Sequence, residues 1–336
     1  MTDIRSISSA AALRVTLIVC AVVVALRFLW VAHAIFMVAA LGILFGLALT
    51  RAVDHLERLR IPRGLGSPLA LLVIVGALVA AGALLLPRLI EQSQGLAQQV
   101  PQMLQRLNPT AKFLVTHLGR ELQSAPKFLF PIVSTAAGAI AGIVLVLFIS
   151  MYIAVSPRLY RDGLLHLVPH AQREQAAETF ATLASTLRQW LIARLIAMVL
   201  IGAITALGLI ALRIEGAIAL GVLAGLLEFI PFFGPIASAI PAIGIAAAQS
   251  PEKALWVALL YLAVQQLEGN VVTPLLLKQR LDVPPVLTVV AVAALGVVFG
   301  VIGMLIAEPL TAVALVLTKL LYVEQVVGDP VTVGKE

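Results

Sequence analysis

The chain has 336 residues, of which 61% are hydrophobic and only 12% are charged, and its mean hydropathy is +1.06. Soluble domains are about half apolar and about a quarter charged, so this composition predicts an integral membrane protein and excludes an ordinary soluble domain. The formal net charge of +6 comes from basic residues in short connecting segments, so we expect no nucleic-acid partner.

Long apolar runs predict an all-α membrane protein with about eight hydrophobic segments, because about 20 apolar residues cross about 30 Å of hydrocarbon. The N-terminal run is too long for one span, so we expect two helices between Val15 and Leu49 with a turn near Arg27 to His33. Four further ordinary helices are expected at about 68–86, 132–155, 191–212 and 254–271.

Two apolar segments, 216–248 and 284–318, are too long for one helix and too short for two spans. Their interruptions are Pro231, Gly234 and Pro235 in the first segment, and Gly300 and Gly303 in the second. Proline removes a backbone donor and glycine permits a tight reversal, so we expect two re-entrant helical hairpins. The alternative is that these residues only kink ordinary transmembrane helices.

Each expected hairpin follows an ordinary helix, and the two helix–hairpin units would have opposite orientations. This is the inverted repeat of many secondary transporters, whose broken helices meet near the membrane midplane. Basic residues near the N-terminus, in the loop 51–63 and in segment 156–190 predict a cytoplasmic N-terminus, and Lys278, Arg280 and Lys319 place the C-terminal end on the same side.

We expect four parts along the chain. They are an N-terminal transmembrane scaffold at 1–155 with an extramembrane insert at about 88–131, a cytoplasmic amphipathic helical segment at 156–190, a transport core at 191–320, and a cytoplasmic tail at 321–336.

Three carboxylates within apolar segments are the first candidates for a substrate or ion site. A charge at the bilayer centre costs about 2.5–3.5 kcal/mol on insertion scales, so such residues are usually functional. Glu228 precedes the first break and could carry a proton, although it could instead cap a half-helix. Glu308 could lie near an interface or pair with a basic group. Arg194 is interpreted as an interfacial cation whose side chain reaches toward water, with a gating role as the alternative.

The third carboxylate, Glu268, belongs to a polar run with Gln265, Gln266 and Asn270. Spacings of three and four residues place these side chains on adjacent stripes of one helix, which predicts a wall for a solute or a cation. The alternative is that the amides hold neighbouring helices together in lipid.

Enzymatic motifs are missing from the sequence: it has no GxxxxGK[ST] loop, HExxH, CxxC or GxSxG. We therefore expect no catalysis, no cofactor and no bound metal. The remaining candidates are a secondary transporter and a non-transporting scaffold or channel, and the paired breaks with buried carboxylates favour the transporter.

Three stretches resemble one known family: "EFIPFFGPIASAIPA", "QQLEGNVVTPLLLKQRLDVPPVL" and "GVVFGVIGMLIAEPLTAV". They are similar to the autoinducer-2 exporter (AI-2E) family of PerM-like permeases. The resemblance covers nearly the whole chain, and the C-terminal half is its specific part. Its signature positions are Ile230, Pro231, Gly234 and Pro235; Gln266, Glu268, Asn270 and Pro274; and Phe299, Gly300, Gly303 and Pro309.

The resemblance implies a multi-pass protein of the bacterial inner membrane that forms homo-oligomers and exports small molecules. Family members are linked to autoinducer-2 and also to exchange of sodium or lithium for protons. Two departures stand out: Glu308 occupies a position that is usually apolar, and the insert at 88–131 is short. We expect a small-solute exporter, with a Na⁺(Li⁺)/H⁺ antiporter or a non-transporting scaffold or channel as alternatives.

Overall fold

A computed structural model describes residues 9–76, 79–80, 83, 136–276 and 284–329. Throughout these residues the regular elements are helices and there is no strand, which confirms the predicted all-α class. The expected insert at about 88–131 lies outside the described residues, as do the basic residues Lys278 and Arg280 and the last part of the tail.

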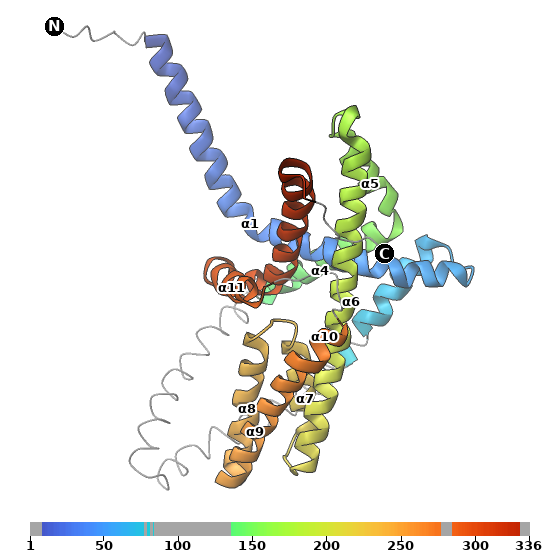
Figure 1. Cartoon of the computed structure of the whole chain (residues 1–336), viewed down its shortest axis with the longest axis vertical. Helices are drawn as coiled ribbons and strands as arrows, with labels where there is room; N and C mark the ends of the chain where they lie inside the picture. Colours follow the sequence, from blue (N-terminus) through green and yellow to red (C-terminus); the bar gives the residue numbers. More distant parts are fainter. Residues whose placement is uncertain (1–8, 77–78, 81–82, 84–135, 277–283, 330–336) are drawn as a thin grey trace, which may run out of the picture.

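The N-terminal run forms one helix, α1 (Ser9–Arg58). The prediction of two helices joined by a turn near Arg27 to His33 is therefore wrong. Figure 1 shows instead that the first part of α1 projects from the bundle at an angle to the remainder. The polar groups of Arg27 and His33 do not interrupt the helix because a helix satisfies its own backbone in lipid.

The remaining scaffold helices are Arg63–Gly76, α4 (Ala136–Val155) and α5 (Pro157–His166), which bends from α4 by 87°. α4 packs closely on α1, because a Cβ atom at Gly42 would lie 2.7 Å from the Cβ atom of Ile149. Ser150 Oγ also donates to the Gly42 carbonyl at 2.9 Å. Small residues and hydroxyl groups at a helix contact are typical of membrane proteins.

A short 3₁₀ turn, His170–Gln172, leads into α6 (Arg173–Ala211). α6 has 39 residues, which at about 1.5 Å per residue makes it far longer than a bilayer core. The expected segment 156–190 thus contains α5, the 3₁₀ turn and the first part of α6, and α6 continues without a break into the fifth predicted span. Trp190, at the junction, is buried against α1 and the chain after α7.

The first predicted hairpin is present as two short helices, α7 (Ala217–Leu227) and α8 (Phe233–Gln249). α7 lies against α6 through glycines: a Cβ atom at Gly202 would lie 3.0 Å from the Gly221 carbonyl oxygen and 3.2 Å from the Gly225 Cα atom. At 11 and 17 residues, neither helix reaches the roughly 20 residues that a span requires.

The helix predicted at 254–271 consists of α9 (Pro251–Leu267), a π-helical turn (Glu268–Val272) and α10 (Thr273–Leu276). Ser250 caps α9 by accepting a hydrogen bond from the Lys253 amide at 3.1 Å, and Pro251 occupies the first helical position.

The second predicted hairpin lies within α11 (Pro285–Leu317), which a π-helical stretch (Thr318–Val327) extends. Gly300, with φ 64° and ψ −149°, divides α11 into two helices. They lie close together, because a Cβ atom at Gly303 would lie 2.1 Å from the Leu295 carbonyl oxygen. Both predicted breaks are thus real, whereas the membrane depth of each hairpin and the inverted repeat stay predictions.

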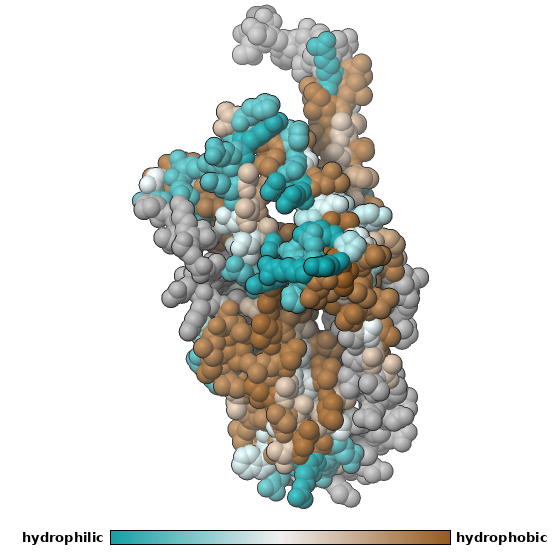
Figure 2. Space-filling model, turned by 90° about the vertical axis from the view of Figure 1, so that its right-hand side faces the viewer, coloured by the Kyte–Doolittle hydropathy of each residue, from teal (hydrophilic) through white to brown (hydrophobic). Residues whose placement is uncertain are grey.

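Among the residues that the structure describes, four helical stretches are long and apolar enough to cross a membrane: Trp30–Arg58, His170–Ala211, Pro251–Leu276 and Pro285–Val327. The α4–α5 pair adds a fifth if it counts as one bent span. Figure 2 shows, on one face, brown apolar surface over much of the lower half, between teal polar residues at the bottom and a teal zone at mid-height. The chain is therefore a multi-pass membrane protein.

Candidate functional site

The turn between α7 and α8 is tight and strained. Phe232 has φ 63° and ψ −43°, and the amide of Phe233 donates to the Pro231 carbonyl at 2.6 Å, which closes a γ-turn. A positive φ at a bulky residue is uncommon, and such strain is often found at functional sites. Pro231 therefore lies at the tip as predicted, whereas Gly234 and Pro235 lie in the first turn of α8.

Gly234 allows the two helices to approach each other. A Cβ atom there would lie 1.9 Å from the Leu227 carbonyl oxygen, and the Gly234 amide donates to the Ile230 carbonyl at 2.9 Å. The predicted tip glycine thus serves the close contact between helices rather than the reversal itself.

Three residues of this turn are buried in the centre of the molecule. Phe229 stacks on Phe45 of α1, with ring centroids 6.2 Å apart, and meets Trp190 of α6 edge to face at 5.9 Å. Ile230 packs against Val292 and Ala307 in the two halves of α11. The first turn is therefore in contact with the second hairpin, as a site made by two broken helices requires.

Glu228, the third buried residue, is 1% exposed and follows the last residue of α7. Its Oε1 atom lies 3.4 Å from Nη2 of Arg194, and Nη1 of the same guanidinium lies 3.7 Å from Oε1 of Glu268. Arg194 thus bridges two carboxylates from two different elements, and we call these three residues the buried ion cluster.

The π-helical turn positions Glu268. In this turn the Thr273 amide donates to the carbonyl of Glu268, five residues earlier. The residue after Thr273 is Pro274, which has no amide hydrogen to donate. Gln265 Nε2 donates to Glu268 Oε2 at 2.9 Å and holds the carboxylate toward Arg194. Single π-helical turns are frequent at functional sites because they shift side chains out of the regular helical register.

The ion pairs in the cluster are loose. Neither oxygen of Glu228 has a hydrogen-bond partner among the described residues, and neither do Nε and Nη2 of Arg194. Charged groups taken out of water are costly unless hydrogen bonds accompany the attraction. The carboxylates of the cluster can therefore bind a proton, a cation or a further hydrogen-bond donor.

A cavity of about 10 Å³ adjoins the cluster, with Glu228, Gln265 and Glu268 in its wall. Thr205 of α6, Ser238 of α8 and Tyr261 of α9 are the other polar residues of its lining. This space is about that of one water molecule. A solute could reach the cluster only after the helices around it move apart.

Glu308 lies in the second half of α11, half-buried, and its Oε2 atom is buried without a hydrogen-bond partner among the described residues. It is close enough to Glu228 for an electrostatic interaction. The site thus brings together all three predicted carboxylates, and they outnumber the one arginine that bridges two of them.

The predicted polar wall is divided between two faces. Gln265 and Glu268 face the cluster, whereas Gln266 and Asn270 are exposed on another side of the helix, where Asn270 Nδ2 donates to the Gln266 side chain at 3.2 Å. Pro309 is buried within the second half of α11, and Pro274 is exposed in α10.

Arg194 lies elsewhere than its sequence led us to expect. Its side chain is 10% exposed, so the interpretation as an interfacial cation is wrong. One signal was available: Arg194 lies three residues inside an apolar run that contains no other charge before Arg213. Nothing in the sequence, however, indicated which carboxylates would pair with it.

Comparison with known proteins identifies a family and several relatives. Residues 17–322 match the family of proteins described as AI-2E family transporters. YueF of Bacillus subtilis is 26% identical over 286 residues, which are 78% of this chain and 77% of that protein. The AI-2 transport protein TqsA of Escherichia coli K12 is 24% identical over 298 residues, 81% of this chain and 82% of that protein.

Proposed function

Because the chain belongs to the AI-2E family of membrane transporters, we propose that it is a secondary transporter that exports a small solute and couples this export to a proton or sodium ion. The observation that carries the proposal is the buried ion cluster, Arg194 with Glu228 and Glu268, at the meeting point of two broken helices. Autoinducer-2 is the first solute to test, because the similar protein TqsA is named for its transport.

The chemistry of the cluster supports coupling. Glu228, Glu268 and Glu308 carry three negative charges when all are ionised, against the single positive charge of Arg194. An unbalanced negative charge is unfavourable in a low-dielectric interior, so a proton or a monovalent cation would stabilise the cluster. Binding and release of that cation would change how strongly Arg194 holds the two elements together.

Transport also requires a second conformation, because the space beside the cluster holds about one water molecule. The α7–α8 hairpin is the element we propose to move, since Glu228 directly precedes its strained turn. The region 191–320 would then be the transport core and the helices of 1–155 its scaffold, with 156–190 and the tail 321–336 on the cytoplasmic side.

Exchange of sodium or lithium for protons is a second candidate function, and the excess of carboxylates over arginine favours it. We further propose an inner-membrane location with both termini in the cytoplasm, since the basic residues of the loop 51–63 and of segment 156–190 are expected on the inside. Homo-oligomers are proposed from the family resemblance alone.

The test is proton flux into proteoliposomes that contain the purified protein and a pH-sensitive dye, with autoinducer-2, sodium or lithium added against an imposed gradient. We expect solute- or cation-dependent flux that falls at least tenfold in Glu228→Gln and in Glu268→Gln. Glu178→Gln is the matched control, because Glu178 is exposed on α6 and lies sixteen residues from Arg194.

Unchanged flux in both variants of the cluster would refute coupling through these carboxylates. Movement of labelled autoinducer-2 without any gradient dependence would indicate a facilitator, with the carboxylates as structural groups. No movement of any solute or cation would leave the non-transporting scaffold as the better description.

A further inference from the structure

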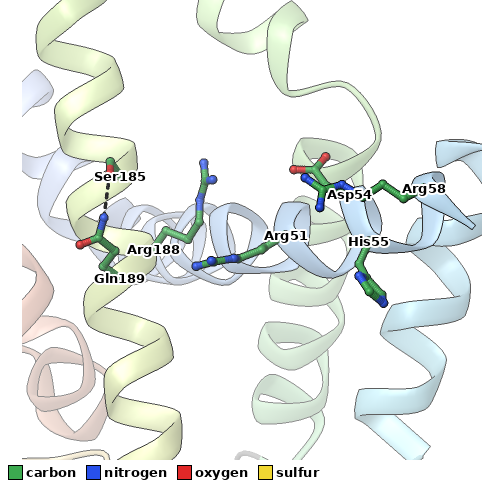
Figure 3. Close-up of a pocket in the computed structure, with 7 residues that line it drawn as sticks. All are labelled: Arg51, Asp54, His55, Arg58, Ser185, Arg188 and Gln189. Atoms are coloured by element: carbon green, nitrogen blue, oxygen red, sulfur yellow. Dashed lines mark hydrogen bonds between the residues drawn. The ribbon is translucent and has the colours of Figure 1, made fainter. Parts of the chain in front are cut away.

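A second polar cavity lies between the C-terminal part of α1 and the first half of α6, away from the buried ion cluster. Its volume is about 560 Å³, within the range of small-ligand sites. Figure 3 shows Arg51 of α1 and Arg188 of α6 reaching into the space between the two helices. Ser185 and Gln189 line the α6 side, and Asp54 and Arg58 line the α1 side.

The charge in this cleft is mainly positive. Arg51, Arg58 and Arg188 line it, and Asp54 is the one acidic residue among the lining side chains. Asp54 is already paired with Arg63, which also binds Glu57 at 2.8 Å. The Asp54 carboxylate therefore offsets little of the charge of the three lining arginines.

Those three arginines have unused hydrogen-bonding capacity. Within the described part of the chain, none of them forms an ion pair or a side-chain hydrogen bond. The Nε atom of Arg188 is moreover buried without a partner. Buried donors in native proteins nearly always have an acceptor, so this one indicates a missing group.

The neighbouring polar side chains also favour an acceptor. Gln189 Nε2 donates to Ser185 Oγ at 3.1 Å, which leaves the hydroxyl hydrogen of Ser185 available to the cleft. Guanidinium groups bind planar or tetrahedral oxyanions in a bidentate manner, and phosphate supplies several acceptor oxygens at once.

We propose that this cleft binds a phosphate group. The positive-inside rule alone explains the number of basic residues here, but it does not require arginines from two helices, 130 or more residues apart in sequence, to line one cavity. The phosphate can belong to a small soluble anion or to the headgroup of an anionic phospholipid. Guanidinium groups recognise the phosphate in either case, and basic pockets between membrane helices are known to bind such headgroups. The cleft is separate from the buried ion cluster: Arg188 precedes Arg194 by six residues, about 9 Å along α6.

The experiment measures binding rather than transport, so its result does not depend on the proposed coupling. Radiolabelled inorganic phosphate is titrated by equilibrium dialysis against the full chain in nanodiscs of phosphatidylcholine, at constant ionic strength. In the lipid arm, protein is reconstituted with a mixture of phosphatidylcholine and phosphatidylglycerol, and the retained phosphatidylglycerol is counted by native mass spectrometry.

Arg51→Gln and Arg188→Gln each remove one arginine of the cleft. Arg161→Gln removes the same charge from α5, where Arg161 pairs with its neighbour Asp162 at 2.8 Å. We expect at least a tenfold loss of phosphate affinity, or of retained phosphatidylglycerol, in both cleft variants and less than a twofold change in Arg161→Gln. Because Arg51 is exposed, its variant is expected to fold even if Arg188→Gln does not.

Phosphate binding that depends on the cleft arginines would identify a soluble anion as the ligand. Lipid retention that depends on them, without phosphate binding, would identify the headgroup. The proposal is overturned if neither probe binds, or if Arg161→Gln reduces binding as much as the cleft variants do, since that would indicate general charge attraction.

Discussion

The two helical hairpins of this protein have the same outline but different tips. The α7–α8 turn is buried, with Ile230 at 5% and Glu228 at 1% exposure, and Glu228 belongs to the buried ion cluster. The tip of α11 is exposed around Gly300, and the flanking Val297 is 88% exposed. The sequence has proline or glycine at both breaks, but only the first tip contributes a carboxylate, Glu228, to an ion pair among the described residues.

Their backbones reverse by different means. In the first hairpin a bulky residue, Phe232, adopts a positive φ that costs about 1–3 kcal/mol when unsupported. In the second, Gly300 adopts a conformation that is open to glycine almost alone. The first turn therefore stores strain that its surroundings must balance, and the second does not.

Their contacts with α1 differ as well. Phe229 of the first turn is enclosed between Phe45 and Trp190. Phe299, next to the second tip, meets His33 and Trp30 of α1, with ring centroids 5.1 and 6.5 Å apart. We infer that release of the first tip needs a change of charge, whereas the second tip meets α1 through aromatic rings.

The largest expected effect comes from Arg194→Gln, which removes the cation from the buried cluster. Breaking a buried ion pair by removing one partner costs about 3–5 kcal/mol, because the other charge is left unpaired. We expect a large fall in the free energy of unfolding, measured in detergent by tryptophan fluorescence. Adding Glu228→Gln in the same chain should restore much of the loss.

Arg158→Gln is the matched control, since Arg158 is exposed on α5 and forms no ion pair with a described residue. Its free energy of unfolding should lie within about 0.5 kcal/mol of the wild-type value. If Arg194→Gln also left the free energy of unfolding unchanged, the buried ion cluster would not stabilise the first hairpin, and the contrast between the two tips would be lost.

Gly234→Ala should have the next largest effect. The new methyl group would lie 1.9 Å from the Leu227 carbonyl oxygen, so α7 and α8 would have to separate. Overpacking usually lowers the free energy of unfolding by about 1–3 kcal/mol. Because this clash is with a backbone atom, we expect a loss at or above the upper end of that range. Gly244→Ala is the control in the same helix, because nothing lies within 4 Å of the added atom.

The same unfolding measurement separates the two glycines. Gly244→Ala should be neutral or slightly stabilising, because alanine favours helix over glycine by about 1 kcal/mol. Equal stability of Gly234→Ala and Gly244→Ala would mean that the hairpin does not close as tightly as described.

Much of this architecture could be predicted from the sequence. Hydropathy and the rarity of charge gave the all-α membrane class, because a bilayer permits few alternatives to a helix. The positions of both breaks followed from Pro231 and Gly300, whose backbone requirements are local. The three carboxylates were identifiable one by one, because each is costly within an apolar segment.

What could not be predicted depends on contacts between distant parts of the chain. The role of Arg194 requires the α7 end and the π-helical turn of α9 to meet beside α6, and no local pattern encodes that meeting. The continuity of α1 was missed for a related reason: a polar residue inside an apolar run is compatible with a turn and with an uninterrupted helix. Gln266 and Asn270 were assigned to the site by their spacing and by the family resemblance, and packing directs them away from it.

The smallest of these effects is expected at the second tip, in Gly300→Ala. Nothing lies within 4 Å of the added methyl group, so its cost is conformational only. A non-glycine residue at this φ and ψ costs about 1–3 kcal/mol, and an exposed tip can relax part of it. We therefore expect a loss near the lower end of that range, with flux through the protein changed less than in Glu228→Gln. If Gly300→Ala instead abolished flux while leaving the unfolding free energy intact, the second tip would be a moving element too, and the distinction between a charged hairpin and a passive one would have to be abandoned.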